Sequence, residues 1–116
     1  MKLGITLVVA AVALAAAATA SSMATPKLTG TVGPGFTISL KKAGKTFKTL
    51  KAGKYTFVVA DKASIHNFQI EGRGLDKAIT SVSFKGTKTV TLTLKNGTYT
   101  FYCTVHPTIT GKFKVT

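Results

Sequence analysis

Three side chains in this sequence have the chemistry to bind one metal ion together. The chain contains a single cysteine, Cys103, and two histidines, His66 and His106. Cys103 and His106 form a Cys-x-x-His pair where an expected strand runs into a short loop, whereas His66 lies far upstream. One thiolate and two imidazoles form the trigonal donor set of blue-copper sites, and such donors favour copper over magnesium, calcium or manganese. Zinc also accepts these donors, but it normally takes four ligands.

The N-terminal segment has the pattern of an export signal. Lys2 precedes a run of apolar residues, and Ala18-Thr-Ala20 provides a small-x-small cleavage site. We therefore predict a signal peptide over residues 1–20, with a second candidate cut after Ala24. The alternative is an uncleaved membrane anchor. It is disfavoured because the alanine-rich run is short and weakly apolar, and a bilayer span needs about 20 strongly apolar residues.

The rest of the chain has the size of one small domain. We predict a flexible lead-in over residues 21–27, a single domain over residues 28–116, and export to the periplasm or the extracellular space. A lone cysteine in an exported protein has no internal disulfide partner. It is therefore buried, paired with another chain or used chemically. The nearby His106 favours chemical use of Cys103.

Almost no segment beyond the lead-in has helical periodicity. Short runs rich in Val, Ile, Thr, Phe and Tyr are separated by glycine-containing turns, which is typical of strands. About eight such runs indicate an all-β fold, a Greek-key antiparallel β-sandwich. The expected strands are 28–32, 36–40, a weak one ending at Leu50, 55–60, 65–70, 82–84, 89–94, 99–103 and 111–115.

Two connections in this pattern determine how the expected strands are joined. Asn96-Gly97 has the residues of a type I′ turn and predicts a hairpin between the runs that flank it. Leu75–Ser81 is ambiguous between a single helical turn and an irregular crossover. In the run that follows the hairpin, Tyr99, Phe101 and Cys103 share one face. The cysteine sulfur is therefore expected to point into the top of the core.

Three blocks of the sequence carry a resemblance to a known family. They are His66-Asn-Phe, Gly97-Thr-Tyr-Thr-Phe-Tyr-Cys-Thr-Val-His-Pro, and Gly111-Lys-Phe-Lys-Val. Together they resemble the cupredoxins, especially the small plastocyanin-like and amicyanin-like members, over essentially all of Lys27–Thr116. The resemblance implies that His66, Cys103 and His106 bind one copper ion (Cu+/Cu2+). It also implies that Asn67 ties the two ligand loops together and donates to the cysteine sulfur.

The weak axial ligand of this family is usually a methionine a few residues beyond the second histidine. In the amicyanin-like spacing this position falls on Ile109, which cannot coordinate a metal. Apart from Met1, the only methionine is Met23, in the lead-in. The resemblance therefore implies a three-coordinate site, with the backbone carbonyl of Ile65 as a candidate distant neighbour. The alternative is a family member that has lost copper binding.

The leading interpretation is an exported type 1 (blue) copper protein that acts as a one-electron carrier and has no enzymatic activity. His106 is expected to be the electron exit, within an apolar surface formed by Pro107, Ile109 and Pro34. One alternative is a copper-binding or delivery protein that exchanges its metal with a partner. Another is a metal-free cupredoxin-like interaction module whose lysines bind an anionic polymer.

The charge balance indicates what kind of partner the surface attracts. Sixteen Lys and Arg residues against three Asp and Glu give a formal net charge of +13. This excess favours anionic partners. We predict a monomer with an acidic redox partner protein and no specific nucleic acid, and an anionic membrane surface is a further partner that the charge would attract. The alternative is that the lysines only keep the surface soluble. Six of them lie close together in the sequence: Lys41, Lys42, Lys45, Lys48, Lys51 and Lys54.

Overall fold

The computed structural model describes residues 24–116, so the predicted signal peptide lies outside the described residues. This part of the chain contains no helix long and apolar enough to cross a membrane. It consists of strands joined by turns and short loops. The strands are β1 (Lys27–Val32), β2 (Ile38–Lys42), β3 (Thr49–Leu50), β4 (Gly53–Asp61), β5 (Phe68–Gly72), β6 (Leu75–Thr80), β7 (Gly86–Leu94), β8 (Gly97–Cys103) and β9 (His106–Val115).

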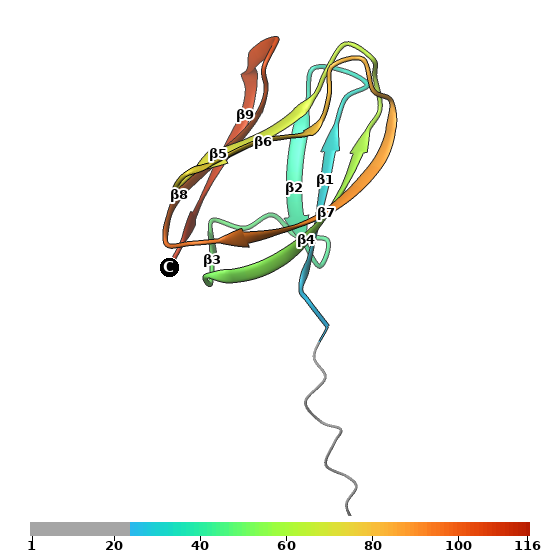
Figure 1. The fold of residues 1–116 in the computed structure, drawn as a ribbon. Coiled ribbons are helices and arrows are strands. Elements are labelled where there is room, and N and C mark those ends of the chain that lie inside the picture. Colours follow the sequence, from blue (N-terminus) through green and yellow to red (C-terminus); the bar gives the residue numbers. More distant parts are fainter. Residues whose placement is uncertain (1–23) are drawn as a thin grey trace, which may run out of the picture.

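The strands form two sheets that face each other as a sandwich (Figure 1). One sheet has the order β2-β1-β4-β7 and the other the order β3-β9-β8-β5-β6. The predicted Greek-key β-sandwich is confirmed, and its two sheets are mixed rather than antiparallel throughout. The β1–β4 and β3–β9 pairs are parallel. Parallel strands are joined by long crossover connections. The order of the strands along the sequence therefore does not reveal which distant strands pair in parallel.

The alternation of apolar residues produced the core that the sequence predicts. Along β4, Tyr55, Phe57 and Val59 are buried, and their neighbours are more exposed. The β8 row of Tyr99, Phe101 and Cys103 is buried in the same way, as are Phe113 and Val115 of β9. Each inward row contributes to one apolar core between the sheets. Because Cys103 ends its row, the thiol lies at one end of that core.

The predicted hairpin at Asn96-Gly97 is wrong. β7 pairs with β4 in the four-stranded sheet, whereas β8 pairs with β5 and β9 in the other sheet. The connection therefore passes from one sheet to the other. The buried Tyr99 hydroxyl fixes this corner, because it accepts from the Lys95 N–H at 2.8 Å and donates to the Lys95 carbonyl at 3.0 Å. This arrangement resembles the tyrosine corner of Greek-key sandwiches.

Leu75–Thr80 is a strand, so neither the helical turn nor the irregular crossover is correct. β6 pairs with β5 through a two-residue loop, Arg73-Gly74, in which both residues have positive φ (44° and 79°). Two positive φ values are the signature of a type I′ hairpin. The exposed residues of β6 are consecutive, so this segment lacks the alternation of apolar and polar residues that predicts a strand.

Other boundaries also differ from the sequence-based expectation: β2 begins at Ile38, β7 at Gly86 and β9 at His106. The expected strand at 82–84 is a turn, closed by the bond from Phe84 N–H to the Ser81 carbonyl at 3.1 Å. β5 begins at Phe68 rather than at Ile65. His66 therefore lies in the loop between β4 and β5, not on a strand, and the path of that loop determines its position.

Candidate metal centre

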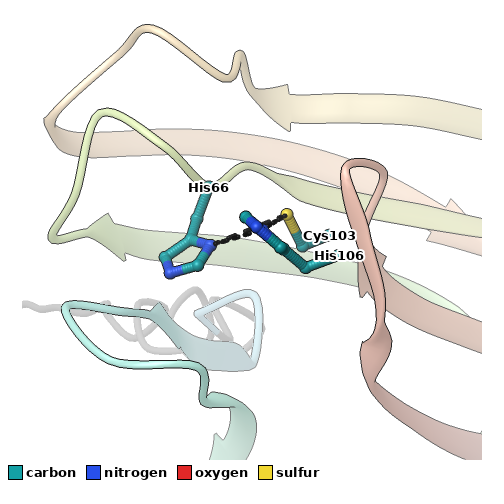
Figure 2. A group of neighbouring side chains, drawn as sticks. All are labelled: His66, Cys103 and His106. Atoms are coloured by element: carbon teal, nitrogen blue, oxygen red, sulfur yellow. Dashed lines mark hydrogen bonds between the residues drawn. The ribbon is translucent and has the colours of Figure 1, made fainter.

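His66, Cys103 and His106 meet at one end of the sandwich (Figure 2). Their ligand atoms all lie within 4.8 Å of one another. The two Nδ1 atoms are 3.1 Å apart, and the Cys103 Sγ lies 3.8 Å from Nδ1 of His66 and 3.7 Å from Nδ1 of His106. Both imidazoles thus turn the same nitrogen toward the sulfur. The structure brings together the three side chains that the sequence singled out.

The β4–β5 loop carries His66 into a fully buried position. The His66 N–H donates to the Ala63 carbonyl at 3.3 Å, which folds the loop back on itself. The loop after β1 packs against it at Gly33, which has φ of 75°. A Cβ at Gly33 would lie 3.1 Å from His66 Cδ2 and 3.3 Å from Ala63 Cβ. Glycine at position 33 therefore allows both the backbone conformation and the close approach to the imidazole.

The other two side chains face each other across the turn between β8 and β9. Cys103 ends β8, His106 begins β9, and the two residues are paired in the ladder. Cys103 is fully buried, whereas His106 is only partly buried. The cluster therefore reaches the surface through the His106 ring, and the sulfur and the His66 ring are enclosed.

Asn67 joins the two ligand loops. Its buried Oδ1 accepts from the Thr104 backbone N–H at 2.8 Å and from the Thr104 hydroxyl at 3.1 Å. Asn67 directly follows His66, and Thr104 directly follows Cys103, so these bonds fix the separation of two donors. The donation from the Asn67 amide to the Cys103 sulfur stays a prediction, because both hydrogen bonds shown for this side chain go to Thr104.

Replacement of Asn67 by alanine should weaken the link between the loops. We expect Asn67→Ala to lower the free energy of unfolding by about 1–3 kcal/mol, because Thr104 N–H loses a partly buried acceptor. Urea unfolding of the metal-free protein measures this loss. Asn67→Asp is the matched control, since it keeps an acceptor oxygen at the same place. Equal losses in the two variants would contradict the role of Oδ1.

The sequence reasoning missed Phe36. Its ring contacts both imidazoles edge-on, with centroids 5.4 Å from His66 and 5.1 Å from His106. Yet 68% of this large apolar side chain is exposed. The sequence predicts a strand over 36–40, whereas β2 begins only at Ile38 and Phe36 lies in the Gly/Pro loop before it. A bulky aromatic residue directly after Gly33-Pro-Gly35 was the available signal.

The donor set fits a type 1 copper site, and its spacing fits a single metal ion. With the bond lengths of zinc sites, about 2.0–2.1 Å to nitrogen and about 2.3 Å to sulfur, angles near 120° separate sulfur from nitrogen by about 3.8 Å. The observed separations are 3.8 and 3.7 Å. The closer approach of the two nitrogens, 3.1 Å, corresponds to a narrower angle of about 100° at the same bond lengths. In addition, the buried Nε2 of His66 has no hydrogen-bond partner among residues 24–116. Nδ1 is thus the only His66 nitrogen that meets other polar atoms.

Ile109 is 93% buried near the start of β9. The ladder pairs Cys103 with His106 and then Tyr102 with Thr110, so residues 107–109 form an irregular stretch beside the cluster. Residues 24–116 contain no methionine. The assignment of Ile109 to the axial position remains a prediction from the resemblance.

Comparison with known proteins supports the fold. No protein-family model matches the chain, and no curated protein matches it. Among solved structures, rusticyanin from Thiobacillus ferrooxidans is 24% identical, with a TM-score of 0.51, over 82% of this chain and 79% of that chain. Another structure, of the copper protein rusticyanin at 2.1 Å, is 22% identical, also with a TM-score of 0.51, over 82% and 80% of the two chains. The chain therefore has the cupredoxin fold.

Proposed function

We propose that this protein is an exported type 1 copper protein that carries single electrons. His66 Nδ1, His106 Nδ1 and Cys103 Sγ would hold one copper ion, and the site would lack a methionine ligand. The observation that carries this proposal is the convergence of one thiol and two imidazole nitrogens within 4.8 Å on a cupredoxin fold. The comparison with a copper protein of the same fold agrees with it.

When bound, copper supplies a centre that alternates between Cu+ and Cu2+. The residues of this chain would hold that centre in a fixed site that is largely closed to water. His66 and Cys103 are 0% exposed, so water is excluded from two of the three donors. The Asn67–Thr104 hydrogen bonds and the Cys103–His106 ladder pair hold the donors in fixed positions. A site that moves little between oxidation states suits electron transfer better than metal exchange.

Three exposed apolar residues adjoin the cluster, along the chain or by direct contact, and form an apolar collar. We use this name for Phe36, Ile65 and Val105, whose exposed fractions are 68%, 52% and 52%. Ile65 precedes His66, Val105 precedes His106, and the Phe36 ring contacts both imidazoles. A redox partner seated on the collar would meet His106, the most exposed of the three proposed ligands. We therefore place electron exchange at this end of the molecule.

The net charge should attract an acidic redox partner from a distance. Because the Debye length falls from about 30 Å at 0.01 M salt to about 10 Å at 0.1 M, steered encounters slow down as salt rises. We expect the bimolecular electron-transfer rate with an acidic partner to fall across this range, as measured by stopped-flow. A neutral small-molecule reductant is the control and should show no such fall. An unchanged rate with the acidic partner would show that the lysines do not steer this encounter and would favour their role in solubility.

The two histidines should respond differently to removal. His66→Ala removes a fully buried donor, and we expect it to weaken copper retention by more than about 100-fold, since even residues that only orient a ligand are worth 10–100-fold. His106→Gly opens the partly buried side, so added imidazole should enter and restore the spectrum. Dialysis against a competing chelator measures retention in both variants. Retention equal to that of the parent protein in either variant would contradict the proposed ligand set.

Copper delivery is the second candidate function, and it uses the same three donors. The same dialysis separates it from electron transfer, because a delivery protein must release its metal to a competitor readily. The burial of His66 and Cys103 favours slow release. A metal-free interaction module would show no visible absorption after copper loading.

A further inference from the structure

A cleft of about 830 Å³ opens at another place on the molecule. This volume is within the range of small-ligand sites. The segment that connects β2 to β4 provides most of its walls, and Pro26 and Thr116 complete them. Four lysines line it: Lys42, Lys45, Lys51 and Lys54. Phe47, Leu50, Tyr55 and several small or hydroxyl residues complete the lining. We call it the lysine cleft.

The lysine cleft lies at the opposite end of the sandwich from the three donors. β1 and β4 run parallel, from the cleft toward the loops of the candidate metal centre. Gly53, at the start of β4, lines the cleft. Asp61, at the end of β4, pairs with Val32 of β1. The next residue after Val32 is Gly33, which lies against His66. At about 3.3 Å per residue, the length of β4 separates the two ends by about 26 Å. The cleft is therefore a separate feature of the molecule.

The charged side chains that line the cleft are all of one sign. None of the three acidic side chains lines it. Asp61 is buried at the far end of β4. Glu71 accepts from the Tyr102 hydroxyl, and Asp76 accepts from the Gln69 amide, on β5 and β6. The four lysines therefore line the cleft without a carboxylate side chain among the lining residues, which favours an anionic ligand with several charges.

Backbone hydrogen bonds build the walls in advance. The Lys42 and Lys45 backbones exchange two bonds, at 2.9 and 3.1 Å, across a tight turn. The buried Tyr55 hydroxyl donates to the Lys51 carbonyl at 2.7 Å. Thr116 bonds to Ala52 N–H at 3.0 Å and to the Leu50 carbonyl at 2.9 Å. A ligand would therefore meet a formed cleft and would have to order only the lysine side chains.

The lining also discriminates between kinds of anion. Bases of single-stranded nucleic acids stack on exposed aromatic rings, but Tyr55 is 95% buried and the Phe47 ring packs edge-on against Phe113 at 5.3 Å. A membrane surface is flat and takes up exposed apolar side chains. The three exposed large apolar residues of the described chain form the collar at the other end. A concave lining of lysines suits a flexible chain of charges.

We propose that the lysine cleft binds a linear polyanion without bases, a polymer whose phosphate or carboxylate groups repeat along a flexible chain. The polymer would hold the protein at one end and leave the apolar collar at the other end uncovered. This inference goes beyond the proposed function and does not depend on it, because no proposed copper ligand lines the cleft.

Binding of two probe polymers tests the proposal. Linear polyphosphate and polygalacturonate are titrated into the protein at 0.05 M and 0.15 M salt and followed by isothermal calorimetry, with and without bound copper. We expect saturable binding of at least one polymer, weaker at the higher salt and independent of copper. The tighter polymer identifies the preferred charged group. Failure of copper loading would leave this result unchanged, so the two proposals can fail separately.

Matched charge variants locate the site. Replacing the four cleft lysines by glutamine should weaken polymer binding by about tenfold or more, since several exposed charge pairs are lost together. The control removes the same number of charges from exposed lysines outside the cleft: Lys62, Lys77, Lys85 and Lys112. We expect this control to bind within about twofold of the parent protein, because it changes only the general field.

Three outcomes would overturn the proposal. Equal losses in the two variants would show that net charge alone attracts the polymer. Tighter binding to a single-stranded DNA oligonucleotide of equal charge would point to a nucleic-acid surface. Tighter binding to phosphatidylglycerol vesicles than to either polymer would point to a membrane surface.

Discussion

Cys103→Ser should abolish the intense visible absorption of the copper-loaded protein and leave a folded β domain. The absorption comes from the bond between thiolate sulfur and copper, and a serine oxygen cannot replace that bond. Cys103 Sγ is the only sulfur atom in residues 24–116, and it lies at nearly equal distances from the two Nδ1 atoms. Absorption spectroscopy after copper loading measures the loss, and far-ultraviolet circular dichroism measures the fold.

The fold should survive because the change is small. Serine adds a buried hydroxyl at the end of the β8 row, which costs about 1–3 kcal/mol if it finds no partner. Thr104→Ser is the matched control next to the site. It keeps the backbone N–H and the hydroxyl that donate to Asn67, so it should keep the full absorption. Visible colour in Cys103→Ser would show that copper binds elsewhere.

Much of the candidate site was predictable because its determinants are local. The Cys-x-x-His spacing places two donors across one turn, and the alternation along Tyr99–Cys103 determines that the thiol points inward. The approach of His66 to Cys103 and His106 depends on the tertiary structure. It depends on which sheet β5 joins and on the close packing at Gly33, so the sequence supported it only through the resemblance.

The features that were missed have tertiary causes. Asn96-Gly97 has the local chemistry of a hairpin, but Leu94 and Tyr99 must both be buried in a core made by two sheets, so the chain changes sheets there. Phe36 contacts the imidazoles only because distant loops meet. The lysines at 41–54 were recognised as a cluster, but their distance from the candidate metal centre follows from the parallel β1–β4 pair.

Ile109→Met should lower the reduction potential of the copper-loaded protein and change its visible spectrum. A thioether donates electron density, which stabilises Cu2+ relative to Cu+, whereas isoleucine has no lone pair and excludes water. The parent protein should therefore have a high potential for this fold. A tenfold change in the relative affinity for the two oxidation states corresponds to about 59 mV for one electron. We expect a decrease of at least this size in protein-film voltammetry.

Ile109→Leu separates the donor effect from packing. Leucine also lacks a lone pair and has nearly the same volume, so this buried substitution should cost less than about 1.5 kcal/mol and leave the potential nearly unchanged. If Ile109→Met also leaves potential and spectrum unchanged, Ile109 only packs the β8–β9 turn. Another donor, such as the Ile65 carbonyl, would then occupy the axial position. Equal shifts in both variants would instead show that packing of the turn sets the potential, because only methionine brings a sulfur atom to the metal.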